Sequence, residues 1–349
     1  MLRAKFEKLD KPFKSHKSVV LRVTLTNDGS DDLHVLTWNT PLDSLPTDCL
    51  EIKLNGKRLE FDGPIVKRAA PTAKDYLLIK AGQSVTADYV VSDAYDTSKP
   101  GKYQVKIKTP IMDGGPKQKG LATSGRLRVL QAAHPIVDKT NFEVQQGVGK
   151  RLTLGENARR KELKSAKAKS STKKSSVKKN NLAATTGAML PKFTGGTAAQ
   201  KSTGKKAHQD GYQLCVNALA NLTNNARYVE WFGAHTTTRL KKVKSNYTAV
   251  KKRMETIQFT YNLTLSGCNS GVYAYTYKDT STIWFCDQFW AAPATGTDSK
   301  AGTVLHEHTH SDAMTDDNVY GQPGCRALAI SNPTKAIQNA DSHEYYAGG

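Results

Sequence analysis

The sequence lacks several features that would assign it to a membrane or to a small zinc-binding domain. No run of 18 or more apolar residues occurs in its 349 residues, so no segment predicts a membrane span. No apolar core follows Met1, Arg3 and Lys5, so no signal peptide is visible. No Cys-x-x-Cys pair occurs, which argues against a structural zinc knuckle. The protein is therefore either cytosolic or numbered from a point after a removed signal.

The few cysteines favour the second possibility. Cys49 stands alone in the N-terminal half, and the other four are widely spaced in the C-terminal part: Cys215, Cys268, Cys286 and Cys325. Four such cysteines in a compact segment fit two disulfides and an oxidising compartment. The alternative is that they are buried free thiols. We therefore predict a secreted, extracellular protein.

Acidic residues are nearly missing from the middle of the chain. Between Lys150 and Lys206 there are 16 Lys and Arg against Glu156 and Glu162 alone, which accounts for 14 of the net charge of +20. This segment is low in complexity and lacks aromatic residues over AKAKSSTKKSSVKK, so it buries too little surface to fold. Residues 150–206 are predicted to be a flexible Lys-rich linker, and the charge describes that linker rather than a basic folded surface.

The region before the linker shows the alternation of β-strands. Val19, Leu21, Val23 and Leu25 alternate with polar residues, and Asn55-Gly56 is a hairpin signal. About seven short strands without a helix signal predict an all-β, immunoglobulin-like sandwich over residues 1–149. Further strands are expected over 34–38, 50–54, 76–79, 84–91, 103–108 and 125–130.

The region after the linker, residues 207–349, has a different pattern. Apolar residues follow helical spacing over 208–232 and 239–257, and strands rich in Tyr, Thr, Ile and Trp are expected over 259–265 and 272–285. Helical spacing returns over 299–314 and 333–346, where Pro333 suits a first turn. This order of helices, strands and helices predicts an α+β domain.

One motif in this region carries chemistry. Residues 306–310 read HEHTH, an HExxH motif. Positions i and i+4 share one face of a helix, so His306 and His310 can bind one metal ion. Glu307 is one position away and can reach a metal-bound water as general base without binding the metal.

A catalytic zinc usually takes three protein ligands and keeps one position for water. The downstream candidates are Asp312, Asp316, Asp317, Asp341, His343 and Glu344. Asp312 follows His310 by only two positions and is expected to point away from the metal. The Gly and His of the metzincin motif are replaced by Ala313 and Asp316, so a metzincin site is excluded.

HEHTH followed by the segment from Met314 to Gly321 resembles the deuterolysin and peptidyl-Lys metallopeptidase family, the aspzincins. A Tyr-x-x-Trp-Phe-Gly element at 228–233 and Asn-Ala-Asp at 339–341 add to the likeness, which covers residues 208–349. The resemblance implies a zincin-like fold, one zinc ion per chain and Asp317 as the third ligand. It also implies that the Tyr320 hydroxyl stabilises the oxyanion. Where the family has glycine this chain has Met314, after a short spacer, so we expect a tight turn.

The resemblance also concerns cysteines and the N-terminal half. Similar family members form a disulfide at the positions of Cys268 and Cys286, which leaves Cys215 to pair with Cys325 and Cys49 free. Family precursors carry a propeptide, which implies that residues 1–149 are a prodomain and that the enzyme is made as a zymogen.

Asp341 and Glu344 lie three positions apart on an expected helix, so both carboxylates share one face. In the Lys-specific branch of the family, two acids at this spacing line the pocket for the residue after the scissile bond. The resemblance therefore implies an S1′ pocket for lysine at P1′. A buried acid pair is costly unless a cation arrives, which would select for lysine. The alternative is a pair of ordinary solvated acids.

These inferences predict a monomeric peptidase that acts on proteins or peptides, with no nucleic-acid or membrane partner. We expect it to cut its own Lys-rich linker, and the prodomain to act as an intramolecular inhibitor by placing a lysine in the acidic pocket. Two alternatives remain: a nucleic-acid-binding protein that uses the basic linker, and a zinc-containing module without catalysis.

Overall fold

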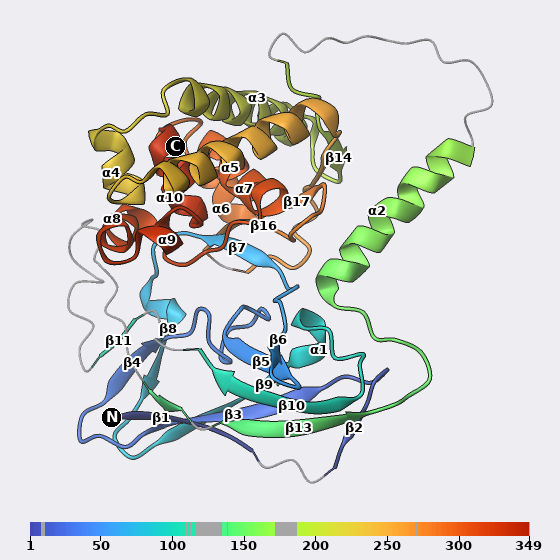
Figure 1. Ribbon diagram of the computed structural model, residues 1–349, viewed down its shortest axis with the longest axis vertical. Coiled ribbons are helices and arrows are strands. Elements are labelled where there is room, and N and C mark those ends of the chain that lie inside the picture. The colour runs from blue at the N-terminus through green and yellow to red at the C-terminus, as the bar shows by residue number, and fades with distance from the viewer. Residues whose placement is uncertain are drawn as a thin grey trace. The chain divides into compact units, whose positions relative to one another are not determined.

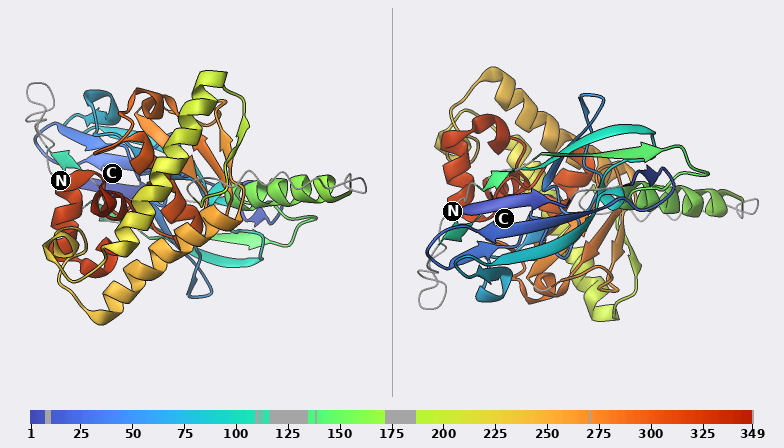
Figure 2. Two further views of the ribbon diagram at one scale, coloured as in Figure 1. Left: turned by 90° about the horizontal axis from the view of Figure 1, so that it is seen from above. Right: turned by 90° about the horizontal axis from the view of Figure 1, so that it is seen from below.

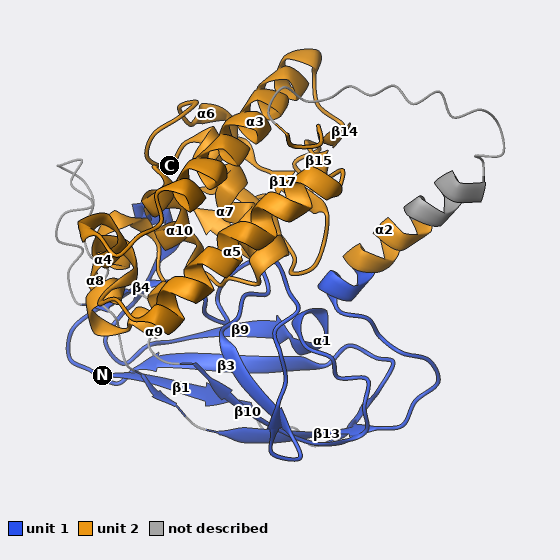
Figure 3. Cartoon of the chain, turned by 45° about the horizontal axis from the view of Figure 1, so that its top comes forward, with its two compact units in different colours: residues 1–64, 71–157 blue, residues 65–70, 158–349 orange. Residues whose placement is uncertain are grey.

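The computed structural model describes residues 1–7, 11–108, 111, 113–115, 135–137, 139–171, 187–269 and 271–348, with side chains omitted for 165–171. The chain forms two compact units (Figure 3). Unit 1 contains residues 1–64 and 71–157, and unit 2 contains residues 65–70 and 158–349. Figure 1 labels the helices and strands along the chain.

Unit 1 is built mainly from strands. One sheet has the order β12 (Ile136–Val137), β1 (Leu2–Phe6), β3 (Val20–Asn27) and β9 (Ser84–Val90). A second has the order β2 (Phe13–Lys14), β13 (Thr140–Gln145), β10 (Gly101–Ile107), β5 (Leu50–Leu54) and β6 (Lys57–Arg58). A third contains β11 (Gly114–Gly115), β4 (Leu33–Leu36) and β8 (Tyr76–Ile79). Two short helical turns, η1 (Ala73–Asp75) and α1 (Val91–Ala94), interrupt the strands.

The alternation along β3 defines the core of this unit. Leu21, Val23 and Leu25 are buried, and they belong to the same apolar cluster as Ile52 of β5 and Val105 of β10. Figure 2 shows β1 and β3 side by side in the view from below. Most pairs are antiparallel, as predicted, but β1–β12 and β2–β13 are short parallel pairs. The predicted strand at 125–130 lies outside the described residues.

Unit 2 combines helices with one mixed sheet, which confirms the predicted α+β order. The sheet has the order β14 (Lys192–Thr194), β15 (Thr260–Asn262), β17 (Thr282–Phe285), β16 (Val272–Thr276) and β7 (Ile65–Arg68). Its larger helices are α3 (Ala198–Ala220), α4 (Ala226–Phe232), α5 (Thr237–Thr256), α7 (Lys300–Ala313), α8 (Gly321–Ser331) and α10 (Ala340–Ala347), with α6 (Asp287–Ala291) and α9 (Pro333–Ala336) between them. No helix within the described ranges is both long and apolar enough to cross a membrane.

Helix α7 lies in the core of unit 2 and is buried over nearly its whole length. The Ser299 hydroxyl accepts a hydrogen bond from the Gly302 amide and caps its first turn. At its other end Met314 adopts a left-handed conformation with φ of 59°. This residue stands where the resemblance expects glycine, and the left-handed cap ends the helix within one residue and produces the predicted tight turn.

The segment 65–70 was predicted to belong to the N-terminal sandwich, but it is part of unit 2. Strand β7 pairs antiparallel with β16, with Val66 opposite Tyr275 and Ile65 opposite Thr276. The strand is buried along its length, and it forms the edge of the sheet of unit 2. A local sequence pattern predicts a strand but not its partner, because pairing across some 200 residues leaves no local signal.

The predicted linker boundaries at 150 and 206 also need correction. Helix α2 covers Leu154–Ser171, strand β14 begins at Lys192, and α3 begins at Ala198. The Glu162 carboxylate accepts hydrogen bonds from the Ser281 amide and the Thr282 hydroxyl, which orders α2 within unit 2. At the other end a capping box between Thr197 and Gln200 starts α3. Residues 172–186 of the predicted linker lie outside the described part of the chain.

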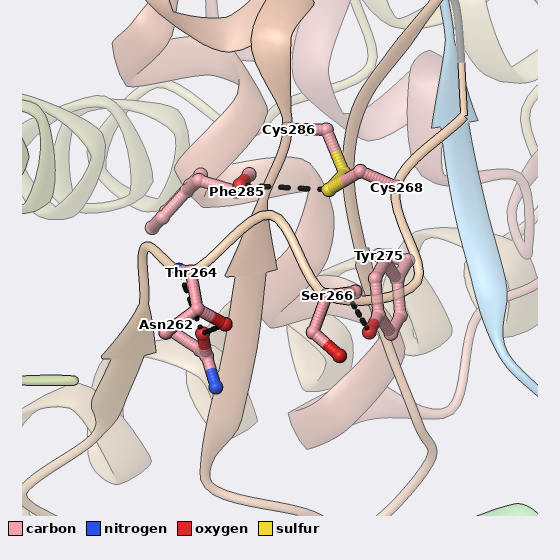
Figure 4. The surroundings of a disulfide bond; sticks show 7 residues. All are labelled: Asn262, Thr264, Ser266, Cys268, Tyr275, Phe285 and Cys286. Atoms are coloured by element: carbon pink, nitrogen blue, oxygen red, sulfur yellow. Dashed lines mark hydrogen bonds between the residues drawn. A yellow bond between two sulfur atoms is a disulfide. The ribbon is translucent and has the colours of Figure 1, made fainter. Parts of the chain in front are cut away.

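The structure contains the predicted disulfide between Cys268 and Cys286, with a Cα–Cα distance of 5.4 Å (Figure 4). The predicted pairing of Cys215 with Cys325 is wrong, since both are free and buried, as is Cys49. The Cys215 thiol donates to the Tyr247 carbonyl, whereas Cys325 accepts a hydrogen bond from the Asn339 side chain. Each sulfur therefore packs as a small buried group in its own surroundings.

A glycine at the crossing of α3 and α7 gives a test of this packing. A Cβ atom at Gly211 would lie 2.9 Å from the Ala301 carbonyl oxygen and 3.0 Å from Val304 Cγ1. We expect Gly211→Ala to lower the free energy of unfolding by about 1–3 kcal/mol, because α3 and α7 must separate. Gly324→Ala in α8 is the matched control, since its Cβ would meet nothing closer than 3.4 Å. Urea unfolding of both variants measures the effect, and equal stabilities would contradict this account of the crossing.

Candidate active site

Three side chains from two segments bring potential metal ligands together. His306 and His310 lie one turn apart on α7, and their Nε2 atoms are 3.0 Å apart. Asp317, on the loop after α7, places Oδ1 3.2 Å from His306 Nε2 and 3.3 Å from His310 Nε2. A tetrahedral ion bound at 2.0–2.1 Å separates its ligand atoms by about 3.3 Å. The three atoms therefore fit the ligand spacing of zinc.

The hydrogen bonds behind these atoms support the same conclusion. Nδ1 of His310 lies 3.0 Å from the Thr315 carbonyl oxygen, which can only accept, so Nδ1 carries the proton. In a neutral ring Nε2 then presents a lone pair toward the other histidine. Oδ1 of Asp317 is buried and has no regular hydrogen-bond partner in the part of the chain that the structure describes. A lone pair of His310 and a carboxylate oxygen of Asp317 that converge on one point form a site that suits a cation.

Glu307 lies next to this group but does not join it. Both of its carboxylate oxygens are buried and have no hydrogen-bond partner among the described residues. Burial raises the pKa of Glu307 to about 8, against the opposing effect of His306. A divalent cation at the three ligands would lower this pKa again. A buried carboxylate that is free to take a proton suits a general base.

The other candidates for third ligand point elsewhere. Asp316 is half exposed and pairs with Lys278 at 2.5 Å. Asp312 accepts a hydrogen bond from His308 and pairs with Arg253, on the face of α7 away from the metal ligands, as predicted. His343 contacts Asn246 and the Ile337 carbonyl oxygen.

The predicted acid pair lines a second buried site, and a lysine occupies it. Lys67 of β7 is fully buried, and its Nζ lies 2.7 Å from Glu344 Oε2 and 3.4 Å from Asp341 Oδ1. Nζ also lies 5.3 Å from the centre of the Tyr273 ring. Burial lowers the pKa of Lys67, but the carboxylates outweigh it and raise this pKa well above its usual value. Asp341 and Glu344 thus share one face, as predicted, and that face binds an ammonium group.

His306 connects the two sites. Its Nδ1 lies 2.9 Å from Asp341 Oδ1 and 3.3 Å from Glu344 Oε2. Burial lowers the pKa of His306, but Asp317 on one side and the acid pair on the other raise it well above its usual value. The same carboxylates that favour a proton on this ring favour a metal ion at Nε2.

A glycine makes room for this arrangement. A Cβ atom at Gly302 on α7 would lie 2.5 Å from Glu344 Oε1. Helix α10 can therefore bring Glu344 against α7 only because position 302 has no side chain. The sequence showed glycine here but gave no sign that it faces a carboxylate 42 residues away.

Tyr320 and the strand that carries Lys67 also meet. The Tyr320 hydroxyl donates to the Val66 carbonyl oxygen at 2.9 Å, and it lies 3.5 Å from Asp317 Oδ2. Val66 and Lys67 are consecutive, so one peptide unit presents its carbonyl to Tyr320 while the next side chain enters the acidic pocket. Val66 and Lys67 were not among the predicted site residues, because nothing local in the sequence distinguishes them from other strand residues.

An α+β unit with an HExxH helix and a convergent third carboxylate defines a zinc metallopeptidase. A family model described as lysine-specific metallo-endopeptidase matches residues 217–348, and an immunoglobulin-like domain model matches residues 10–145. An extracellular protease of Aeromonas hydrophila is 32% identical over 341 residues, covering 95% of this chain and 88% of that protein. The chain belongs to the aspzincin family of zinc metalloendopeptidases.

Two further proteins match a little under half of the chain. A peptidyl-Lys metalloendopeptidase of Pleurotus ostreatus is 38% identical over 162 residues, covering 44% of this chain and 95% of that protein. A solved zinc peptidase from Grifola frondosa is 32% identical, covers 44% of this chain and 96% of that chain, and has a TM-score of 0.41. Family membership supports peptide hydrolysis over the two alternatives considered from the sequence.

The neighbouring acids Asp316 and Asp317 allow a sharp test of the ligand set. We expect Asp317→Ala to weaken zinc binding by at least about 100-fold, since losing a ligand exceeds the usual cost of losing its supporting group. Asp316→Ala is the matched control and should retain zinc, because the described ion pair of Asp316 is with Lys278, away from His306 and His310. Metal content after dialysis against a weak chelator distinguishes them. Loss of zinc from the Asp316 variant alone would show that Asp316, and not Asp317, is the third ligand.

Proposed function

We propose that this aspzincin is secreted as a monomeric zymogen and hydrolyses peptide bonds on the amino side of lysine. In this proposal His306, His310 and Asp317 hold one zinc ion, and the lysine of the substrate binds Asp341 and Glu344. The observation that carries the proposal is the peptide unit of Val66 and Lys67. Its carbonyl oxygen accepts from Tyr320, and the next side chain contacts both pocket acids.

The chemistry divides among the residues of the site. Zinc, when bound by the three ligands, supplies a Lewis acid that lowers the pKa of water and polarises a carbonyl. Glu307 accepts the proton of the attacking water and later delivers it to the leaving amine. Tyr320 donates to the scissile carbonyl oxygen as negative charge develops there, and its present bond to the Val66 carbonyl supports this role.

The lysine preference follows from the cost of burying two acids together. Asp341 and Glu344 have side chains that are 2% and 0% exposed, so neither contacts bulk solvent. A lysine ammonium offsets their charge and supplies hydrogen bonds, whereas a neutral side chain does neither. The name of the Pleurotus relative, a peptidyl-Lys enzyme, adds support to the same preference.

The same contacts support inhibition by the propeptide. Strand β7 runs antiparallel to β16, so it occupies a sheet edge along which an extended peptide could bind. While Lys67 occupies the acidic pocket, a substrate lysine cannot contact Asp341 and Glu344. We infer that residues 65–70 act as the intramolecular inhibitor and that activation requires their removal. Cleavage before a lysine in the Lys-rich segment 150–206 would begin that release.

The first test is the loss of the general base. We expect the full-length Glu307→Ala chain to persist uncut, while the wild-type chain is trimmed to fragments whose new N-termini are lysines. The measurement is N-terminal sequencing of the products, with and without a zinc chelator. Trimming of the purified variant at the wild-type rate would rule out self-processing, and new N-termini without lysine would rule out the preference.

Removal of the inhibitory side chain gives a second test. We expect Lys67→Met to shorten the lag before a quenched Lys peptide is cut by at least about tenfold, because truncating a buried charged partner costs about 2–5 kcal/mol. Lys74→Met, at an exposed position in unit 1, is the control and should keep the wild-type lag. An unchanged lag in the Lys67 variant would show that this lysine does not restrain the enzyme.

A further inference from the structure

A third carboxylate contacts the ammonium group in the acidic pocket. Asp298, in the loop between α6 and α7, places Oδ1 3.2 Å from Lys67 Nζ. We propose that Asp298 is a specificity-determining residue that binds the lysine ammonium of a substrate together with Asp341 and Glu344. This inference rests on the proposed lysine preference and adds a residue from a different element of the fold.

The number of acceptors matches the number of donors. A lysine ammonium has three N–H bonds, and Nζ of Lys67 has three carboxylate partners, at 2.7, 3.2 and 3.4 Å. Two partners come from α10 and the third from the α6–α7 loop. With Asp298 removed, one N–H would lose its charged acceptor. A planar guanidinium presents its donors in a fixed fork, so acceptors gathered around one nitrogen favour lysine over arginine.

A hydrogen bond and the backbone of the loop hold Asp298 in position. The Tyr345 hydroxyl donates to Asp298 Oδ1 at 2.9 Å and lies 3.3 Å from Asp341 Oδ2, which joins the loop to α10. The backbone of Asp298 has φ of 51°, and the next residue, Ser299, caps α7. The carboxylate is therefore fixed beside the pocket before any substrate binds, and little ordering cost remains.

Exposure distinguishes the three acids. The side chain of Asp298 is 30% exposed, against 2% for Asp341 and 0% for Glu344. Asp298 thus lies on the solvent side of the pocket, and its carboxylate is partly exposed to solvent while it contacts the ammonium group. An incoming lysine can exchange hydration for this contact before it reaches the two buried acids. The expected effect of Asp298 is therefore on substrate binding rather than on the chemical step.

The test compares Asp298→Asn with Asp279→Asn in the processed enzyme. Asp279 is also an aspartate with positive φ, of 54°, and its side chain is 66% exposed. Asparagine tolerates this backbone conformation, so both variants should fold. We expect Asp298→Asn to raise KM for a Lys peptide about tenfold at unchanged kcat, the effect of one charge-assisted hydrogen bond. For a matched norleucine peptide, Asp298→Asn should change KM by less than twofold. Asp279→Asn should keep the wild-type KM for both peptides.

The outcomes separate this inference from the proposed function. If the wild-type enzyme shows no preference for lysine over norleucine, the proposed lysine specificity is wrong. If the preference exists and Asp298→Asn keeps the wild-type KM, the two buried acids suffice and only the role of Asp298 is overturned. An equal rise in KM for Asp279→Asn would show that the loss of one negative charge anywhere on the enzyme has this effect. It would also overturn the role of Asp298.

A second measurement does not depend on catalysis. In the inactive Glu307→Ala chain, Asp298→Asn should lower the unfolding temperature when Lys67 is present, and much less when Lys67→Met is also present. This double-mutant cycle isolates the contact between the two side chains. Additive effects would show that Asp298 does not bind the ammonium.

Discussion

The contact of three carboxylates with the ring of His306 is the constraint on which the rest of unit 2 depends. Asp317 lies 3.2 Å from Nε2, and Asp341 and Glu344 lie 2.9 and 3.3 Å from Nδ1. So much buried negative charge is stable only with cations nearby. A metal ion can supply one on the Nε2 side, and Lys67 supplies the other beyond Nδ1. The metal centre and the lysine pocket are therefore two halves of one charge arrangement.

Part of this arrangement could be predicted because it depends on helical spacing. His306, His310 and Glu307 take their relative positions from one helix, and Asp341 and Glu344 share a face for the same reason. Asp317 needed the resemblance to a known family, because the helix ends at the left-handed turn at Met314 and its spacing cannot show which aspartate faces His306 and His310. Local periodicity can position residues along one element, but it cannot say how a loop directs the next one.

What could not be predicted comes from contacts between distant elements. Lys67 reaches the pocket because β7 pairs with β16, and Asp298 reaches it because the α6–α7 loop is held against α10. Helix α8 was not predicted from the sequence, because glycine and proline, which are unfavourable in helix interiors, lie in its first turn and interrupt the apolar spacing. The pairing of Cys215 with Cys325 failed for a related reason: counting cysteines cannot reveal that each sulfur already has its own buried partner.

Under the proposed function, the preference for lysine and the inhibition by Lys67 have one physical origin. When Lys67 leaves, Asp341 and Glu344 lose their cation, and their mutual repulsion raises the free energy of the open pocket. A substrate lysine relieves that repulsion, whereas a neutral side chain leaves it in place, so part of the preference comes from the instability of the empty site. In the proposed zymogen, the same instability would hold residues 65–70 in place before activation. A mutation that weakens the acid pair should thus loosen the zymogen and relax the specificity together, because both draw on the same charges.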